Sequence, residues 1–295
     1  MGYLFLSLAL LSGATKGFCG KKTSGFIKGT KDSILSNIIR MLLCIAIGFV
    51  ILLFSGSLPQ LLPSAELLLI CALSGISTAV FVVTWLISVQ KSAYMMLDVF
   101  LMLGVLIPII CGNIFFNETV KLTQWIGIAV LFVAVVIMCS YNNTIKQKIT
   151  IPSLLLLIAC GLSNGITDFS QKLFIKRLPD ISVSVFNFYT YIFAALTLVI
   201  AYFLIRTQEE RADPKVFLHI FGYVFVLAAC LFANSYFKTL AANHLDAVLL
   251  YPLNQGAGLI LSSVMAAVFF REKLTAKCIT GLIIAFIGLL IINLL

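Results

Sequence analysis

Long apolar segments separated by short polar turns make up almost the whole of this chain. The apolar segments run for about 20 residues, the length that an α-helix needs to cross a bilayer core about 30 Å thick. Runs such as IGIAVLFVAVVIM do not alternate apolar and polar residues, as the strands of a membrane barrel would. The pattern therefore predicts membrane-spanning helices, which satisfy their own backbone hydrogen bonds in lipid.

Ten such segments follow one another along the chain, so we predict an all-α membrane protein with ten transmembrane helices. The predicted spans are 2–19, 34–54, 66–89, 93–116, 122–141, 152–174, 183–205, 216–240, 247–270 and 275–295.

One stretch of the sequence occurs twice. Residues 93–138 align without a gap with residues 247–292, so that Glu118 falls on Glu272, and each copy is two apolar segments joined by an FF-x-E turn. Five spans per half is an odd number, so the second half must enter the membrane in the opposite sense to the first. The sequence therefore predicts two five-helix inverted repeats.

The predicted division of the chain follows from this duplication. The first five-helix repeat covers 1–141, a polar linker covers 142–151, and the second repeat covers 152–295.

Composition agrees with a membrane protein. Apolar residues make up 61% of the 295 residues and charged residues 11%, against about 25% charged in soluble domains. The net charge of +9 does not indicate nucleic-acid binding, because the lysines and arginines lie mostly at span ends. More lysines and arginines lie in or beside the loops after spans one, three, five, seven and nine than on the opposite side. Arg40 is counted on the side with more basic residues, and Lys172 and Lys238 on the other. The positive-inside rule then places both termini outside.

Ionisable and polar residues inside spans four and nine are the first candidates for function. Asp98 lies a few residues into span four, with Tyr94 one turn before it on the same face. Asp98 is either a site for a proton or a cationic group, or a carboxylate that reaches the interface or a neighbouring helix. Tyr251, Asn254 and Gln255 in span nine also share a helix face.

Span six carries a second polar stripe. Asn164, Thr167, Asp168 and Gln171 recur at helical spacing, and such a stripe is not expected to face lipid. It either lines a cavity, in which case Asn164 and Asp168 would contact a substrate, or bonds to neighbouring helices. Gly161-x-x-x-Gly165 on the same helix indicates close packing against another helix.

The matching Glu118 and Glu272 are expected to cap the N-terminus of the helix that follows each turn. The eight cysteines are scattered singly, and the sequence contains no phosphate-binding loop, nucleophile elbow or zinc motif. We therefore expect no enzyme activity, no cofactor and no metal.

The duplicated segments resemble the ten-span EamA-domain members of the drug/metabolite transporter superfamily. The resemblance rests on FFNETVKLTQWIGIAVLFVAVVI and FFREKLTAKCITGLIIAFIGLLII, which are similar to the ending of each EamA domain. It rests also on LLSGATKGFCGKK and CGLSNGITDFSQK, which are similar to the first span of each domain. Two features depart from the family pattern. Ser12-Gly13 stands where the family usually has Trp-Gly, and FFNET lacks the basic residue that FFREK keeps.

The resemblance implies a secondary transporter, often an exporter of amino acids, nucleobases or similar metabolites, with a central cavity between the halves. Spans four and nine would contribute Tyr94, Asp98, Tyr251, Asn254 and Gln255 to that cavity. The expected location is a bacterial inner membrane. The resemblance also implies that both termini are cytoplasmic, against the charge distribution, so the orientation stays open.

The expected partners are a small-molecule substrate, membrane lipids and a coupling proton or ion, with no nucleic acid, in a monomer or homodimer. Two other functions remain alternatives at this point: a translocase for lipids or lipid-linked sugars, and a membrane scaffold or sensor that transports nothing. A scaffold has no use for two repeats that alternate access, so the duplication argues against it.

Overall fold

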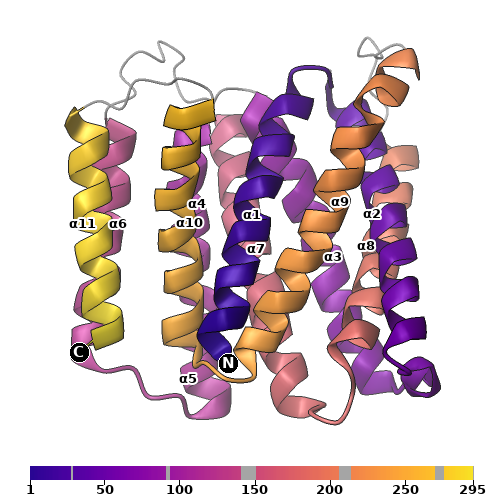
Figure 1. Cartoon of the computed structure of the whole chain (residues 1–295), viewed down its shortest axis with the longest axis horizontal. Coiled ribbons are helices and arrows are strands. Elements are labelled where there is room, and N and C mark those ends of the chain that lie inside the picture. Colours follow the sequence, from indigo (N-terminus) through magenta and orange to yellow (C-terminus); the bar gives the residue numbers. More distant parts are fainter. Residues whose placement is uncertain (28, 91–93, 141–150, 206–213, 270–275, 295) are drawn as a thin grey trace.

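The computed structural model describes residues 1–27, 29–90, 94–140, 151–205, 214–269 and 276–294. Within these ranges it leaves the side chains at 94–96, 98, 99, 135, 138–140, 214–219, 262, 265–267, 277, 278 and 294 undescribed. The described residues are α-helical apart from short turns and one 3₁₀ turn, η1 (Leu58–Leu61). The helices stand side by side and cross the molecule in alternating directions (Figure 1). Their bounds are α1 (Gly2–Ser24), α2 (Gly29–Phe54), α3 (Ala65–Gln90), α4 (Tyr94–Gly104), α5 (Leu106–Phe116), α6 (Leu122–Ser140), α7 (Ile151–Arg177), α8 (Val183–Leu204), α9 (Pro214–Ala242), α10 (Ala247–Phe269) and α11 (Ala276–Leu294).

Each segment predicted as a span falls on helix, but predicted span four is not one helix. It divides at Val105 into α4 and α5. Pro108 has no N–H to offer the carbonyl of Gly104, so the helical ladder loses a hydrogen bond there. The second copy has Ser262 where the first has Pro108, and α10 is unbroken although it contains Pro252 nearer its start. The predicted linker lies outside the described residues except for Ile151, which already belongs to α7.

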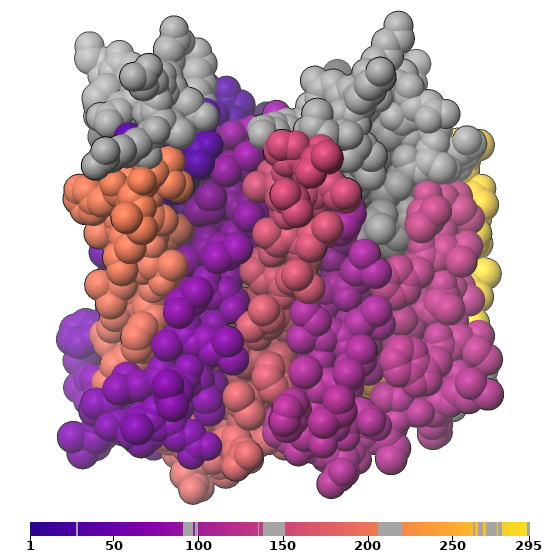
Figure 2. All heavy atoms as spheres, turned by 180° about the vertical axis from the view of Figure 1, so that it is seen from behind, coloured from indigo at the N-terminus to yellow at the C-terminus, as the bar shows by residue number. Residues whose placement is uncertain are grey.

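The two halves interleave rather than forming separate bundles. α1 packs on α9 as α7 packs on α3, and α4 packs on α7 as α10 packs on α1. α2 pairs with α8 and α6 with α11, each helix with its own counterpart in the other half. Figure 2 shows α7 lying between α3 and the segment of α4 and α5. Exchanging the halves reproduces the same set of helix contacts. α1 and its counterpart α7 run in opposite directions (Figure 1), as repeats of inverted orientation require.

Glycines allow the closest of these contacts. A Cβ built on Gly104 would lie 2.2 Å from the carbonyl oxygen of Gly161, and one on Gly165 would lie 2.2 Å from the carbonyl oxygen of Gly104. The backbones of α4 and α7 therefore touch where they cross, which confirms the packing role predicted for Gly161 and Gly165.

The exterior suits a lipid environment. Six described helices, α1, α2, α3, α7, α8 and the Ile220–Ala242 part of α9, are long and apolar enough to cross a membrane. Shorter apolar helices lie within the other predicted spans. Large apolar side chains such as Phe54, Leu69 and Phe203 are exposed on the outer surface. In water such a surface would be unfavourable, whereas in a bilayer it contacts acyl chains.

Three basic residues counted at span ends are buried instead. Arg40, Lys172 and Lys238 have exposed fractions of 4%, 1% and 6%, inside α2, α7 and α9. They therefore do not belong to the interfacial charges that set orientation. Removing them subtracts one basic residue from the side richer in charge and two from the other, so the asymmetry keeps its direction.

Candidate functional site

A cavity of about 120 Å³ lies in the middle of the bundle. Its walls come from α1, α3 and α4 of the first half and α7, α9 and α10 of the second. This volume has room for several water molecules or a small organic group. Its lining residues are Leu10, Gly13, Ala14, Lys16, Gly17, Phe81, Trp85, Leu101, Asn164, Asn234, Lys238, Asn254, Gln255, Gly258 and Leu259.

Three of the predicted substrate-binding residues line this cavity. Asn164 projects from α7, and Asn254 and Gln255 project from α10. The Oδ1 atom of Asn254 is buried without a hydrogen-bond partner, so one acceptor of a cavity-lining side chain is left unsatisfied. Tyr94 and Asp98 lie on the first turns of α4, but their side chains are outside the described part of the structure. Their assignment to the cavity remains a prediction.

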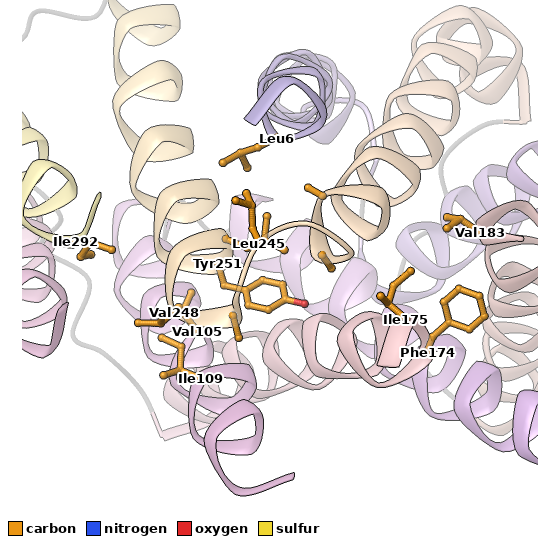
Figure 3. Close-up of a cluster of buried hydrophobic side chains, with 14 of the residues drawn as sticks. Leu6, Val105, Ile109, Phe174, Ile175, Val183, Leu245, Val248, Tyr251 and Ile292 are labelled. Carbon is orange, nitrogen blue, oxygen red and sulfur yellow. The ribbon is translucent and has the colours of Figure 1, made fainter. Parts of the chain in front are cut away.

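Asp168 and Tyr251 lie next to the cavity in fully packed positions. The Asp168 carboxylate forms an ion pair with Lys238 on α9, and both side chains are buried. Asn164 Nδ2 donates to the other carboxylate oxygen of Asp168 at 3.4 Å. Tyr251 projects from α10 into a cluster of buried side chains (Figure 3), and its hydroxyl donates to the Asp168 carbonyl oxygen at 2.6 Å. Both residues therefore support the cavity wall, while Lys238 reaches the cavity itself.

Of the remaining stripe residues, Thr167 donates to the Ser163 carbonyl oxygen within α7, whereas Gln171 bonds to a neighbouring helix. Gln171 Nε2 donates to Ser235 Oγ at 3.1 Å, and Ser235 Oγ donates to Asn187 Oδ1 on α8 at 2.8 Å. Asn234 Nδ2 donates to the Ala9 carbonyl oxygen on α1 at 2.7 Å. Of the two interpretations of the stripe, the cavity holds for Asn164 and bonding between helices holds for Asp168 and Gln171.

Glu118 closes the end of the bundle at which α1 and α10 begin. α5 ends at Phe116, and the next residue, Asn117, is left-handed with a φ of 52°. Asn113 Nδ2 donates to the Glu118 carbonyl oxygen at 3.0 Å. This turn places the carboxylate against the second half. Glu118 Oε2 accepts a hydrogen bond from the Ala247 N–H at 2.8 Å, and Oε1 forms an ion pair with Lys172 at 2.8 Å.

The prediction that Glu118 caps the following helix is therefore wrong. Gln124 supplies that cap, because its Oε1 accepts from the Lys121 N–H at 3.0 Å. Glu118 caps α10 instead, where a carboxylate interacts favourably with the positive end of the helix dipole. The inverted arrangement brings the start of α10 beside this turn. We call Glu118, Lys172 and the first residue of α10, Ala247, the end latch.

Two cavity residues that carry charge, Lys16 and Lys238, were not among the predicted site residues. Lys16 lies well inside α1, and the argument from the cost of a charge within a span applies to it as it does to Asp98. Lys238 had been assigned to a span end, but it shares a face of α9 with Asn234, four residues earlier.

Comparison with known proteins decides the family. The family model of the EamA-like transporter family matches residues 1–140 and again 151–294. The chain belongs to the EamA-like transporter family. It is accordingly a multi-pass integral membrane protein and a membrane transporter of the drug/metabolite transporter superfamily.

Structural comparison supports the fold of this EamA-like transporter. A solved structure described only as "Crystal structure of protein" superposes with a TM-score of 0.78 at 14% sequence identity. The match covers 99% of this chain and 96% of that one. At this identity the likeness shows a shared fold alone. No curated protein matched the chain.

Proposed function

We propose that the protein is a secondary active transporter that moves a small metabolite, such as an amino acid or a nucleobase, across the membrane by alternating access. The observation that carries this proposal is a polar cavity lined by three helices of each half. A site shared between two inverted repeats is exposed to one side or the other when the repeats rock against each other. Such motion changes access to the substrate without moving the substrate far.

The end latch supports this mechanism. It joins the turn after α5 in the first half to α7 and α10 in the second. Lys172 Nζ also donates to the Leu245 carbonyl oxygen at 2.8 Å, just before α10 begins. When this end opens, water can take over these polar contacts and hydrate both charges, which offsets the loss of the ion pair. A polar closure of this kind suits two conformations of similar free energy.

Flux into proteoliposomes tests the proposal. Purified protein would be reconstituted and offered labelled amino acids, nucleosides and cationic drugs, with and without a pH gradient in either direction. We expect at least one compound to accumulate faster than in protein-free liposomes, with a gradient increasing the rate. If no compound moves under any gradient, the small-metabolite carrier is rejected and translocation of labelled lipid becomes the next measurement.

The Asp98→Asn variant, measured beside the wild type, tests the coupling role predicted for this carboxylate. Loss of gradient-driven uptake with retained exchange of substrate would assign coupling to Asp98. Unchanged gradient-driven uptake would leave it a structural carboxylate.

A further inference from the structure

The positive charge of Lys16 has no counter-charge among the described residues. Lys16 lines the cavity, and its ammonium nitrogen lies 5.7 Å from the centre of the Phe81 ring, on the neighbouring helix α3. No described carboxylate lies within ion-pair distance of it. A cation–π contact offsets part of the cost of removing an ammonium group from water, but it does not neutralise the charge.

The charged groups around Lys16 add to the excess of positive charge at this place. The neighbouring groups that act on it electrostatically include two cations, Lys238 and Arg40, and one carboxylate, Asp168. The Asp168 carboxylate is already paired with Lys238. Arg40 is buried in α2, and its Nε has no hydrogen-bond partner. Three cations therefore face one anion in this part of the described structure, in surroundings of low dielectric where charge differences count most.

The rest of the lining shows what else a ligand would meet. Asn254 Oδ1 offers an unused acceptor, and Gln255 adds a second amide. Phe81 and Trp85 provide aromatic surface beside the lysine. The lining therefore offers amide and ammonium groups together with aromatic surface, the two kinds of contact that orient a small organic ligand.

We propose that the cavity binds organic anions, with a carboxylate or phosphate oxygen at Lys16 Nζ and the apolar part of the molecule against Phe81 and Trp85. A donor on the ligand bonds to Asn254 Oδ1. This assignment rests on the proposed carrier function and names the substrate class of that same cavity. It differs from the cationic substrate that Asp98 alone would favour. The charged side chains that the structure describes in the cavity lining, Lys16 and Lys238, are both positive.

Equilibrium binding to the purified full-length protein tests the charge preference. The probes form a set of similar shape: labelled indole-3-acetate as the anion, with indole-3-acetamide and tryptamine as neutral and cationic competitors. Phenyl phosphate is added as a competitor to separate phosphate from carboxylate binding. We expect indole-3-acetate to bind and to be displaced by phenyl phosphate far better than by the amide or the amine.

Variants locate the preference. Lys16→Gln should weaken indole-3-acetate binding about 10-fold or more, the usual effect of deleting a charged hydrogen-bond partner. Lys16→Arg retains the charge and should retain the preference, which excludes a folding defect as the cause. Lys22→Gln removes the same charge from the same helix at an exposed position outside the cavity lining, and it should bind like the wild type.

Three results would overturn the assignment: tighter binding of the amide or amine, wild-type affinity in Lys16→Gln, or no binding of either anionic probe. Flux of the same probes in proteoliposomes separates this failure from failure of the carrier function. Anion binding without flux would leave the site and reject the carrier. Flux of neutral or cationic compounds alone would leave the carrier and reject the anion site.

Discussion

The ion pair between Asp168 and Lys238 is the charged contact nearest the cavity. Both side chains are buried, so a charge that loses its partner is poorly hydrated, Asp168 more so than Lys238, which borders the cavity. Removing one member of such a pair costs about 3–5 kcal/mol, because the remaining charge stays buried and unpaired. We expect Asp168→Asn and Lys238→Met each to lower the free energy of unfolding by this amount, measured by denaturation in mixed micelles.

The double variant distinguishes the pair from its surroundings. Asp168→Asn together with Lys238→Met removes both charges and should recover most of the stability lost by either single change. Lys176→Met, at a side chain that is 41% exposed, serves as the control and should change stability little. Additive losses in the double variant would show that the two side chains do not stabilise each other.

Tyr251 contributes its ring more than its hydroxyl. The ring is 1% exposed within the main apolar cluster, whereas the hydroxyl makes one hydrogen bond to the Asp168 carbonyl oxygen. Tyr251→Phe should therefore cost about 1 kcal/mol of stability. Tyr251→Ala should cost about 3–5 kcal/mol, the usual loss when a buried aromatic ring is deleted. Equal losses in thermal or denaturant unfolding would contradict this division.

Individual residues were the hardest feature to predict from the sequence. Polarity within an apolar span indicated Asn164, Asn254 and Gln255, and the structure places all three at the cavity, because polar groups in a bundle turn away from lipid. Their contact with a substrate stays a prediction. Polarity did not indicate that Asp168 forms an ion pair with Lys238, since that pairing depends on how α7 and α9 pack. The partner of Glu118 was mistaken for the same reason: proximity along the chain favoured the next helix, and the fold supplied a different one.

At the scale of helices, the crossing of α4 and α7 depends on backbone contact. A methyl group on Gly161 would lie 2.2 Å from the Phe100 carbonyl oxygen, which cannot move without shifting the whole helix. We expect Gly161→Ala to lower the free energy of unfolding by about 1–3 kcal/mol through overpacking. Gly222→Ala is the matched control, because a Cβ there meets nothing within 4 Å. A loss of equal size at both positions would contradict close packing as the cause.

The end latch should hold the first turn of α10 in place. Glu118→Gln keeps an oxygen for the Ala247 N–H but removes the charge that pairs with Lys172. We expect faster hydrogen exchange of the amides at 247–250 in this variant, measured by mass spectrometry. Glu66→Gln, at an exposed carboxylate in the first turn of α3, is the control and should exchange like the wild type. Unchanged exchange in Glu118→Gln would show that the latch does not limit opening at this end.

The positions of the helices were largely predictable, because apolar length in lipid leaves the backbone few alternatives. The interruption at Val105 was not. Pro108 removes one backbone hydrogen bond from the first half, yet α10 carries Pro252 and remains one helix. What differs is the neighbour: Gly104 lies against the α7 backbone, where the carbonyl oxygens and the glycines of both helices meet. Local sequence indicates where a helix can break, and packing decides whether it does.

For the whole molecule, the duplication in sequence and the exchange symmetry of the helix contacts describe the same architecture. α1 with α9 and α7 with α3 are one contact made twice. The sequence predicted the repeats, but it did not predict that nearly every extensive contact joins one half to the other. That interleaving is what places residues from both repeats around one cavity. The proposed mechanism follows from it, with a relative motion of the halves changing access to that cavity.

The most direct test of this account is counterflow in proteoliposomes, using a compound found to move in the flux measurements. Vesicles loaded with unlabelled compound are diluted into medium containing a trace of labelled compound, with no ion gradient. A carrier with an alternately accessible site should show transient accumulation of label above its external concentration, because a site that carries an unlabelled molecule out can return with a labelled one. Entry of label only to equilibrium, unaffected by the internal unlabelled compound, would indicate a passive pore and contradict alternating access.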